Sequence, residues 1–86
     1  MPDLMIPVVH LNGTSRDELL KQITDAIEAV NTAMGALQKA APHGRDYYVQ
    51  SSTAIMTAMN QHYDRLEKLR DVRDELQRIG EAIIDQ

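Results

Sequence analysis

The chain of 86 residues lacks cysteine, phenylalanine and tryptophan, and these absences limit both its fold and its chemistry. Without cysteine it has no disulfide to stabilise a small domain and no thiolate to bind zinc or act as a nucleophile. Aromatic side chains supply much of the buried area in typical cores, and here there are only three tyrosines. A single core in a chain of this size rarely contributes more than about 3–5 kcal/mol. Oligomerisation or packing against a partner is the remaining way to stabilise it.

The sequence also lacks long apolar runs and an excess of positive charge. No run of about 18 apolar residues is present, so no membrane span is expected. A formal net charge of −4 argues against nonspecific binding to DNA or to anionic membranes. The first residues lack a basic segment, and Pro7 interrupts their short apolar run, so they do not resemble a signal peptide. We therefore expect an intracellular site of synthesis.

Residues 1–14 predict an extended N-terminal arm that ends in a turn. Pro2 and Pro7 are incompatible with a helix and restrict any strand to the edge of a sheet, and Asn12-Gly13 is a turn signal. Because soluble monomers avoid contiguous exposed apolar patches, we expect the arm to be ordered only through another chain or another part of an assembly. The expected partner-binding residues are Leu4, Ile6, Val8 and Val9.

Residues 15–41 predict a long amphipathic helix. Ser15 and Glu18 have the spacing of a capping box, and Pro42 ends the helix because the residue before a proline avoids helical angles. Apolar residues recur at alternating steps of four and three, with a second line beside them, so the stripe is wider than one antiparallel partner helix covers. The first line is Leu19, Ile23, Ala26, Val30, Ala33, Leu37 and Ala40, and the second is Leu20, Ile27, Met34 and Ala41. The expected packing residues are Leu19, Ile23, Ile27, Val30, Met34 and Leu37.

Residues 51–85 predict a second helix, connected to the first by a loop at 42–50. One step of its apolar line, from Leu69 to Val72, breaks the heptad and predicts less regular winding. The predicted fold is all-α: an antiparallel two-helix hairpin with an extended N-terminal arm, completed by oligomerisation or partner packing. The predicted line is Ile55, Met59, Tyr63 or His62, Leu66, Leu69, Val72, Leu76, Ile79 and Ile83.

Motifs that carry chemistry are not apparent. His10, His43 and His62 are far apart in the sequence and lack the spacing of helical metal ligands, and the glycines are too scattered to hold a phosphate. Arginines of the second helix alternate with aspartates and glutamates, which cancels the positive field that a nucleic-acid-binding helix needs. We expect no catalytic residue, no metal, no cofactor and no sequence-specific nucleic-acid contact, and hence no enzyme.

The loop sequence Pro-His-Gly-Arg-Asp-Tyr-Tyr, residues 42–48, allows two interpretations. In the first it is a turn, with the tyrosines covering the end of the hairpin and Arg45 and Asp46 bonded to helix ends. In the second it is a recognition tip, because tyrosine and arginine are favoured at the centres of interfaces. Both remain open. Arg45, Tyr47 and Tyr48 are the expected partner-binding residues of the loop.

Two motifs, His-Leu-Asn-Gly-Thr-Ser at residues 10–15 and Ala-Pro-His-Gly-Arg-Asp-Tyr-Tyr at 41–48, resemble a group of small proteins of uncharacterised function encoded by tailed bacteriophages and prophages. The resemblance covers residues 10–70. It implies a structural protein in the head or in the head-to-tail (portal or connector) region of the virion, made in the host bacterial cytoplasm. Implied partners are further copies of the chain and other virion proteins. The alternative is a small phage-encoded regulator that binds and inhibits a host protein.

Overall fold

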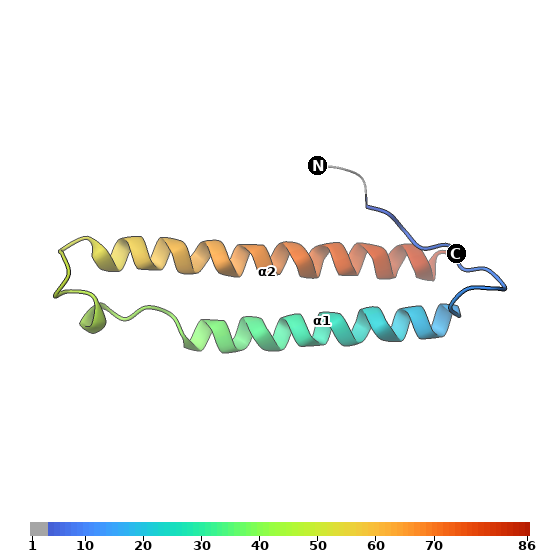
Figure 1. Cartoon of the computed structure of the whole chain (residues 1–86), viewed down its shortest axis with the longest axis horizontal. Helices are drawn as coiled ribbons and strands as arrows, with labels where there is room; N and C mark the ends of the chain where they lie inside the picture. Colours follow the sequence, from blue (N-terminus) through green and yellow to red (C-terminus); the bar gives the residue numbers. More distant parts are fainter. Residues whose placement is uncertain (1–3) are drawn as a thin grey trace.

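The computed structural model describes residues 4–86 as two antiparallel helices lying side by side (Figure 1). Helix α1 spans Arg16–Lys39 and helix α2 spans Ala54–Ile84, with a short 3-10 helix, η1 (Gly44–Asp46), in the connection. Residues 4–86 contain no β-strand, and an extended arm precedes α1. The predicted all-α hairpin is therefore confirmed. Pro2 lies outside the described residues.

Helix α1 begins at a capped N-terminus. The backbone N–H of Glu18 donates a 3.2 Å hydrogen bond to Oγ of Ser15, and Asp17 and Glu18 place negative charge at the positive end of the helix dipole. At the other end the N–H of Ala40 donates to the carbonyl of Leu37 at 3.0 Å, which tightens the last turn. The helix consequently ends two residues before the expected Ala41.

The connection between the helices is longer than the predicted loop at 42–50. The N–H groups of Tyr48 and Gln50 donate to the carbonyls of Gly44 and Tyr47 at 3.1 and 3.0 Å, so backbone turns continue through this stretch. Helix α2 therefore begins at Ala54 rather than near Ser51. Its N-cap residue, Thr53, makes no side-chain capping bond.

The face of α2 that packs on α1 decides between the two predicted residues at one position and differs from the predicted apolar line at two others. His62 is only 3% exposed whereas Tyr63 is 57% exposed, so His62 is the seam residue. Arg73 replaces Val72, which is 46% exposed, and the buried Gly80 replaces Ile79. With these corrections the steps alternate four and three without a break, so the expected irregularity after Leu69 is absent from the helix contact. The seam of α2 consists of Ile55, Met59, His62, Leu66, Leu69, Arg73, Leu76, Gly80 and Ile83.

The seam of α1 uses the second apolar line as much as the first. Met34 is buried, whereas Leu19 is half-buried at the edge of the contact and Ala33 and Ala40 are exposed. Heptad spacing thus places the α1 seam at Leu20, Ile23, Ile27, Val30, Met34 and Leu37, all buried or half-buried. Of the predicted packing residues, only Leu19 lies outside this seam.

Two contacts fix the register of the helices. A Cβ atom added to Gly80 would approach Cγ2 of Ile23 to 3.3 Å, so the absence of a side chain lets the helices come close there. Farther along, Nη1 of Arg73 lies 4.0 Å from Sδ of Met34. The residue numbers of facing positions therefore add up to about 105, as expected for antiparallel helices.

The core of the hairpin is one layer deep. Ile83, Leu66 and Met34 are its buried large apolar residues in the part of the chain that the structure describes. The accessible area is 6563 Å², against about 5,100 Å² for a compact monomer of 9.7 kDa. The radius of gyration is 18.4 Å, against about 12 Å for a compact domain of this length. The hairpin is a rod with little interior.

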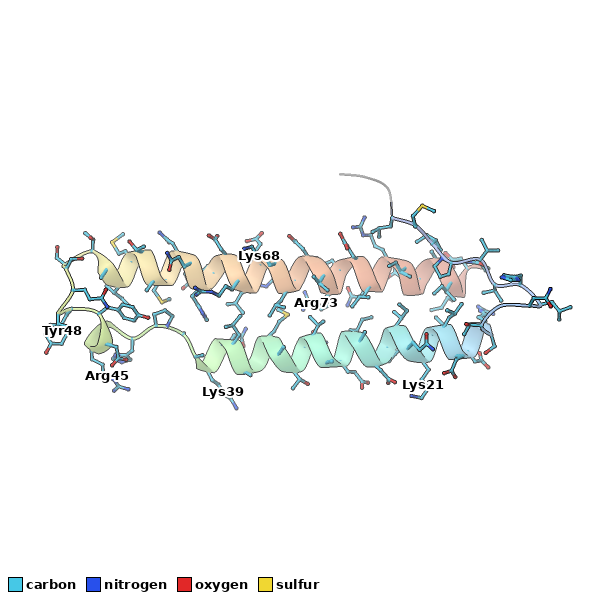
Figure 2. All side chains as sticks on the ribbon, viewed as in Figure 1. Lys21, Lys39, Arg45, Tyr48, Lys68 and Arg73 are labelled. Atoms are coloured by element: carbon cyan, nitrogen blue, oxygen red, sulfur yellow. The ribbon has the colours of Figure 1, made fainter. Side chains whose placement is uncertain are left out.

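Arg73 places a charged group in this thin interface, as Figure 2 shows. Its Nε atom is buried without a hydrogen-bond partner, and the nearest carboxylate oxygen, on Asp74, lies 3.6 Å away. We predict that Arg73→Leu raises the free energy of unfolding by about 1 kcal/mol or more, because it removes an unsatisfied buried polar atom from the seam. Arg70→Leu, at an exposed position one turn earlier, should leave the thermal melting temperature nearly unchanged. Equal shifts in the two variants would contradict this assignment.

Candidate interaction surfaces

The N-terminal arm is held by the last residue of its own chain. Oε1 of Gln86 accepts a 2.8 Å hydrogen bond from the N–H of Val9, and Nε2 of Gln86 donates to the carbonyl of Pro7 at 2.6 Å. Pro7 and Val9 are two residues apart, so the side-chain amide of Gln86 pairs with the backbone of the arm as a neighbouring strand would. Figure 1 shows the arm passing the C-terminal end of α2.

This contact differs from the expectation that the arm is ordered only through another chain or another part of an assembly. Leu4, Ile6 and Val9 are half-buried, whereas Val8 is 72% exposed. Successive side chains of extended backbone point to opposite sides, and the half-buried side changes from even-numbered to odd-numbered positions at Pro7, which is itself half-buried. Val8, together with Met5 at 89% exposure, is therefore the part of the arm most available to a partner.

The turn between the arm and α1 contains a glycine beside an imidazole ring. The N–H of Gly13 donates to the carbonyl of His10 at 3.2 Å, and a Cβ atom on Gly13 would lie 2.6 Å from Nε2 of His10. Gly13 does not have the positive φ that Asn-Gly turns often need. The imidazole ring of His10 packs over Gly13, and because His10 is exposed its ring would have to turn aside for a larger residue. Nearby, the guanidinium of Arg16 donates to the carbonyl of Ile84 and ties the two helix ends together.

The loop at the opposite end of the hairpin is organised by His43. Its Nδ1 accepts a 3.3 Å hydrogen bond from the N–H of Arg45, and its carbonyl accepts from the N–H of Asp46 at 3.0 Å. This caps η1 from within the loop. The expected bonds from the Arg45 and Asp46 side chains to the helix ends are replaced by these local ones. The sequence did not predict this capping role of His43, because histidine is not among the preferred capping residues.

The two tyrosines of the loop occupy different environments. Tyr47 is half-buried, whereas Tyr48 is 72% exposed and projects from the end of the rod with Arg45 (Figure 2). Val49 and Met56 are 75% and 67% exposed. An exposed apolar cluster at the tip of a hairpin is compatible with both interpretations of the loop, and its role in recognition stays a prediction.

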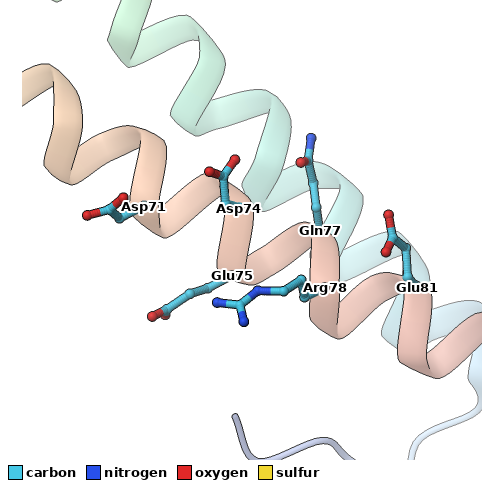
Figure 3. A pocket seen from close by; sticks show the side chains of 6 residues that line it. All are labelled: Asp71, Asp74, Glu75, Gln77, Arg78 and Glu81. Atoms are coloured by element: carbon cyan, nitrogen blue, oxygen red, sulfur yellow. The ribbon is translucent and has the colours of Figure 1, made fainter. Parts of the chain in front are cut away.

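Two shallow grooves lie along α2. The larger, about 390 Å³, is lined in the described residues by Asp71, Asp74, Glu75, Gln77, Arg78 and Glu81, all from this one helix. Figure 3 shows Asp74, Gln77 and Glu81 extending to one side while Arg78 extends toward Glu75 on another. General acid–base chemistry requires side chains that converge on one point. These carboxylates do not converge.

The second groove, about 340 Å³, follows the junction of the two helices beside Gly80. Leu20, Ile27 and Ile84 form its apolar walls, and Thr24, Gln77 and Glu81 form a polar rim. It exists because Gly80 has no side chain to fill the space above Ile23. It is an open depression in the seam.

The charged groups lie mainly on the outer faces. Nζ of Lys21 donates to Oδ2 of Asp25 at 2.8 Å, and this hydrogen bond together with the charge of Asp25 raises the pKa of Lys21 above its ordinary value. Both side chains are exposed, so the pair contributes little to stability. Within residues 4–86 no three histidine, aspartate or glutamate side chains lie close enough together to bind a metal ion.

Comparison of the chain with models of protein families, with curated proteins and with solved structures finds no match. Neither helix in the part of the chain that the structure describes has the length and apolarity needed to cross a membrane.

We predict that Gln86→Ala releases the arm without unfolding the helices, because both hydrogen bonds to the arm come from this one side chain. Amide hydrogen exchange should become faster at Val9, while the far-UV circular dichroism stays unchanged. Asp85→Ala, next to it in sequence, serves as the control. Unchanged protection of Val9 in the Gln86 variant would show that apolar contacts alone hold the arm.

Alanine variants of the two loop tyrosines should differ in thermal stability. Tyr47→Ala should lower the melting temperature, because it removes a half-buried ring from the end of the hairpin. Tyr48→Ala should leave the melting temperature unchanged, because its ring is mostly in solvent. If both variants melted like the parent chain, Tyr47 would not anchor the loop.

Proposed function

We propose that the chain is a non-enzymatic structural protein of a tailed-bacteriophage virion, acting through protein–protein contacts. The observation that carries the proposal is the incomplete core: two long helices share a contact one layer deep and leave apolar residues uncovered on the rod. A protein of this form gains stability when it packs against neighbours, and virion subunits have neighbours in fixed positions.

The shape supports the same role. The rod measures 61 by 25 by 17 Å, with the arm at one end and the tyrosine loop at the other. Contacts at both ends and along the sides let one subunit bridge several others. The position in the head or in the head-to-tail region comes from the resemblance of residues 10–15 and 41–48 to phage proteins, and it belongs to the proposal.

Quantitative mass spectrometry of purified particles tests the role. A structural subunit should be present at a fixed ratio to the major capsid protein from one preparation to the next. A chain that is absent from particles but abundant in infected cells would overturn the proposal and favour a regulator of a host protein. Within particles, Tyr48→Ala should lower the copy number if the loop contacts a neighbour.

A further inference from the structure

Helix α1 places polar residues on one side of the seam and apolar residues on the other. On the polar side they are Asp17, Thr24, Asn31 and Gln38, and α2 exposes Met56, Tyr63 and Ile84 beside them. On the apolar side they are Leu19, Ala26, Ala33 and Ala40, with Ala29 and Ala36 beside them. On the same side α2 contributes Val72 and Ile79, with Arg65 in the same row seven residues before Val72. We call the eight apolar residues of this side the alanine face.

We propose that the alanine face is covered by the same face of a second copy of this chain, forming a four-helix bundle about a two-fold axis. The proposal deepens the virion role proposed above by naming one neighbour and the surface that it occupies. It rests on the area left exposed, on the symmetry of the two stripes and on the placement of charge.

The chain as a whole exposes more surface than a compact monomer. The excess is about 1,400 Å² over the entire rod, its arm and loop included, and the alanine face is one part of it. A standard interface buries about 800 Å² from each partner. Alanine side chains also allow helix axes to approach closely, because interaxial distance depends on the side chains at the contact.

The alanine stripe is symmetric about its own centre. Ala29 and Ala36 lie at nearly equal distances on either side of Ala33, and Ala26 and Ala40 lie seven residues away from it in each direction. A two-fold axis through Ala33, perpendicular to the helix, would place each alanine against an alanine of an antiparallel copy. No charged residue interrupts this stripe from Ala26 to Ala40.

The outer edge of the face on α2 is symmetric about the same level. The contacts of Gly80 with Ile23 and of Arg73 with Met34 place Val72 opposite Ala33 within the hairpin. An axis through this level brings Val72 against its own copy. Lys68 and Glu75, on the outer edge of the face four residues before and three residues after Val72, then meet Glu75 and Lys68 of the second copy.

This charge placement favours a second copy over an unrelated partner. A self-complementary contact requires that each residue and its counterpart attract when the face is turned on itself. Lys68 and Glu75 satisfy that condition twice, once on each side of the axis. Lys68 projects away from α1 into solvent within the single chain, as Figure 2 shows. Arg65, level with Ala40, lies two turns from the axis near the end of the contact.

Sedimentation equilibrium of the purified full chain tests the proposal. The parent should be a dimer, and Ala33→Glu should weaken dimerisation by at least tenfold, because it brings two like charges together at the axis. Asn31→Glu, on the same helix but on the polar side, should remain a dimer. Dissociation by Asn31→Glu with no effect of Ala33→Glu would overturn the proposal, as would a monomeric parent.

A charge exchange tests the geometry without disturbing the seam. Lys68→Glu and Glu75→Lys should each weaken dimerisation about fivefold at low salt, since each places like charges across the axis twice. The double variant should restore the parent affinity. Failure of the double variant to recover would contradict this two-fold arrangement.

The particle experiment separates this inference from the proposed function. A monomeric chain that is nonetheless present in particles at a fixed ratio, and lost from them with Ala33→Glu, would show that another virion protein covers the face. That outcome would overturn the two-fold pair and leave the structural role standing. A chain that dimerises but is absent from particles would support the two-fold pair and overturn the structural role.

Discussion

The single layer of side chains between α1 and α2 is the contact on which the rest of the structure depends. Nothing else in the described chain holds the two helices in register over their length, apart from the bonds that tie the ends. That layer contains a histidine, an arginine and a glycine where leucine or isoleucine would pack more apolar surface. Each of these residues reduces the apolar area that the hairpin buries by itself. A partner that packs on the hairpin can therefore supply a larger share of the total buried area.

The loop and the arm are both organised by short-range polar bonds rather than by burial. His43 caps the 3-10 turn of the loop, and Gln86 clasps the arm. These bonds use backbone groups close in sequence or the last residue of the chain. The side chains of Tyr48 and Val8 therefore stay exposed. The segments are thereby shaped before any partner arrives, which reduces the entropy lost on binding.

Sequence periodicity was sufficient for the hairpin, but for α1 it predicted two neighbouring apolar lines, and the seam takes three residues from each. Periodicity failed at Val72 and Arg73, where hydrophobicity favoured the valine while heptad spacing favoured the arginine. The long apolar stem of Arg73 can pack in the seam, so spacing prevailed even though the Nε atom is buried there without a partner. The clasp by Gln86 was beyond prediction, since it joins residues 77 and 79 positions apart and has no local signal. The sequence indicated which residues of the arm and the loop could bind a partner. The side of the rod on which each residue lies followed only from the register of the two helices.

The two ends of the hairpin are chemically different, with both chain termini near one end and the tyrosine loop at the other (Figure 1). In the proposed antiparallel pair this difference disappears, because each end of the bundle would carry the loop of one copy beside the arm of the other. A directional subunit would thus become a spacer with two equivalent ends. Such a spacer can join two identical surfaces facing one another, and it can do so without any preferred orientation during assembly.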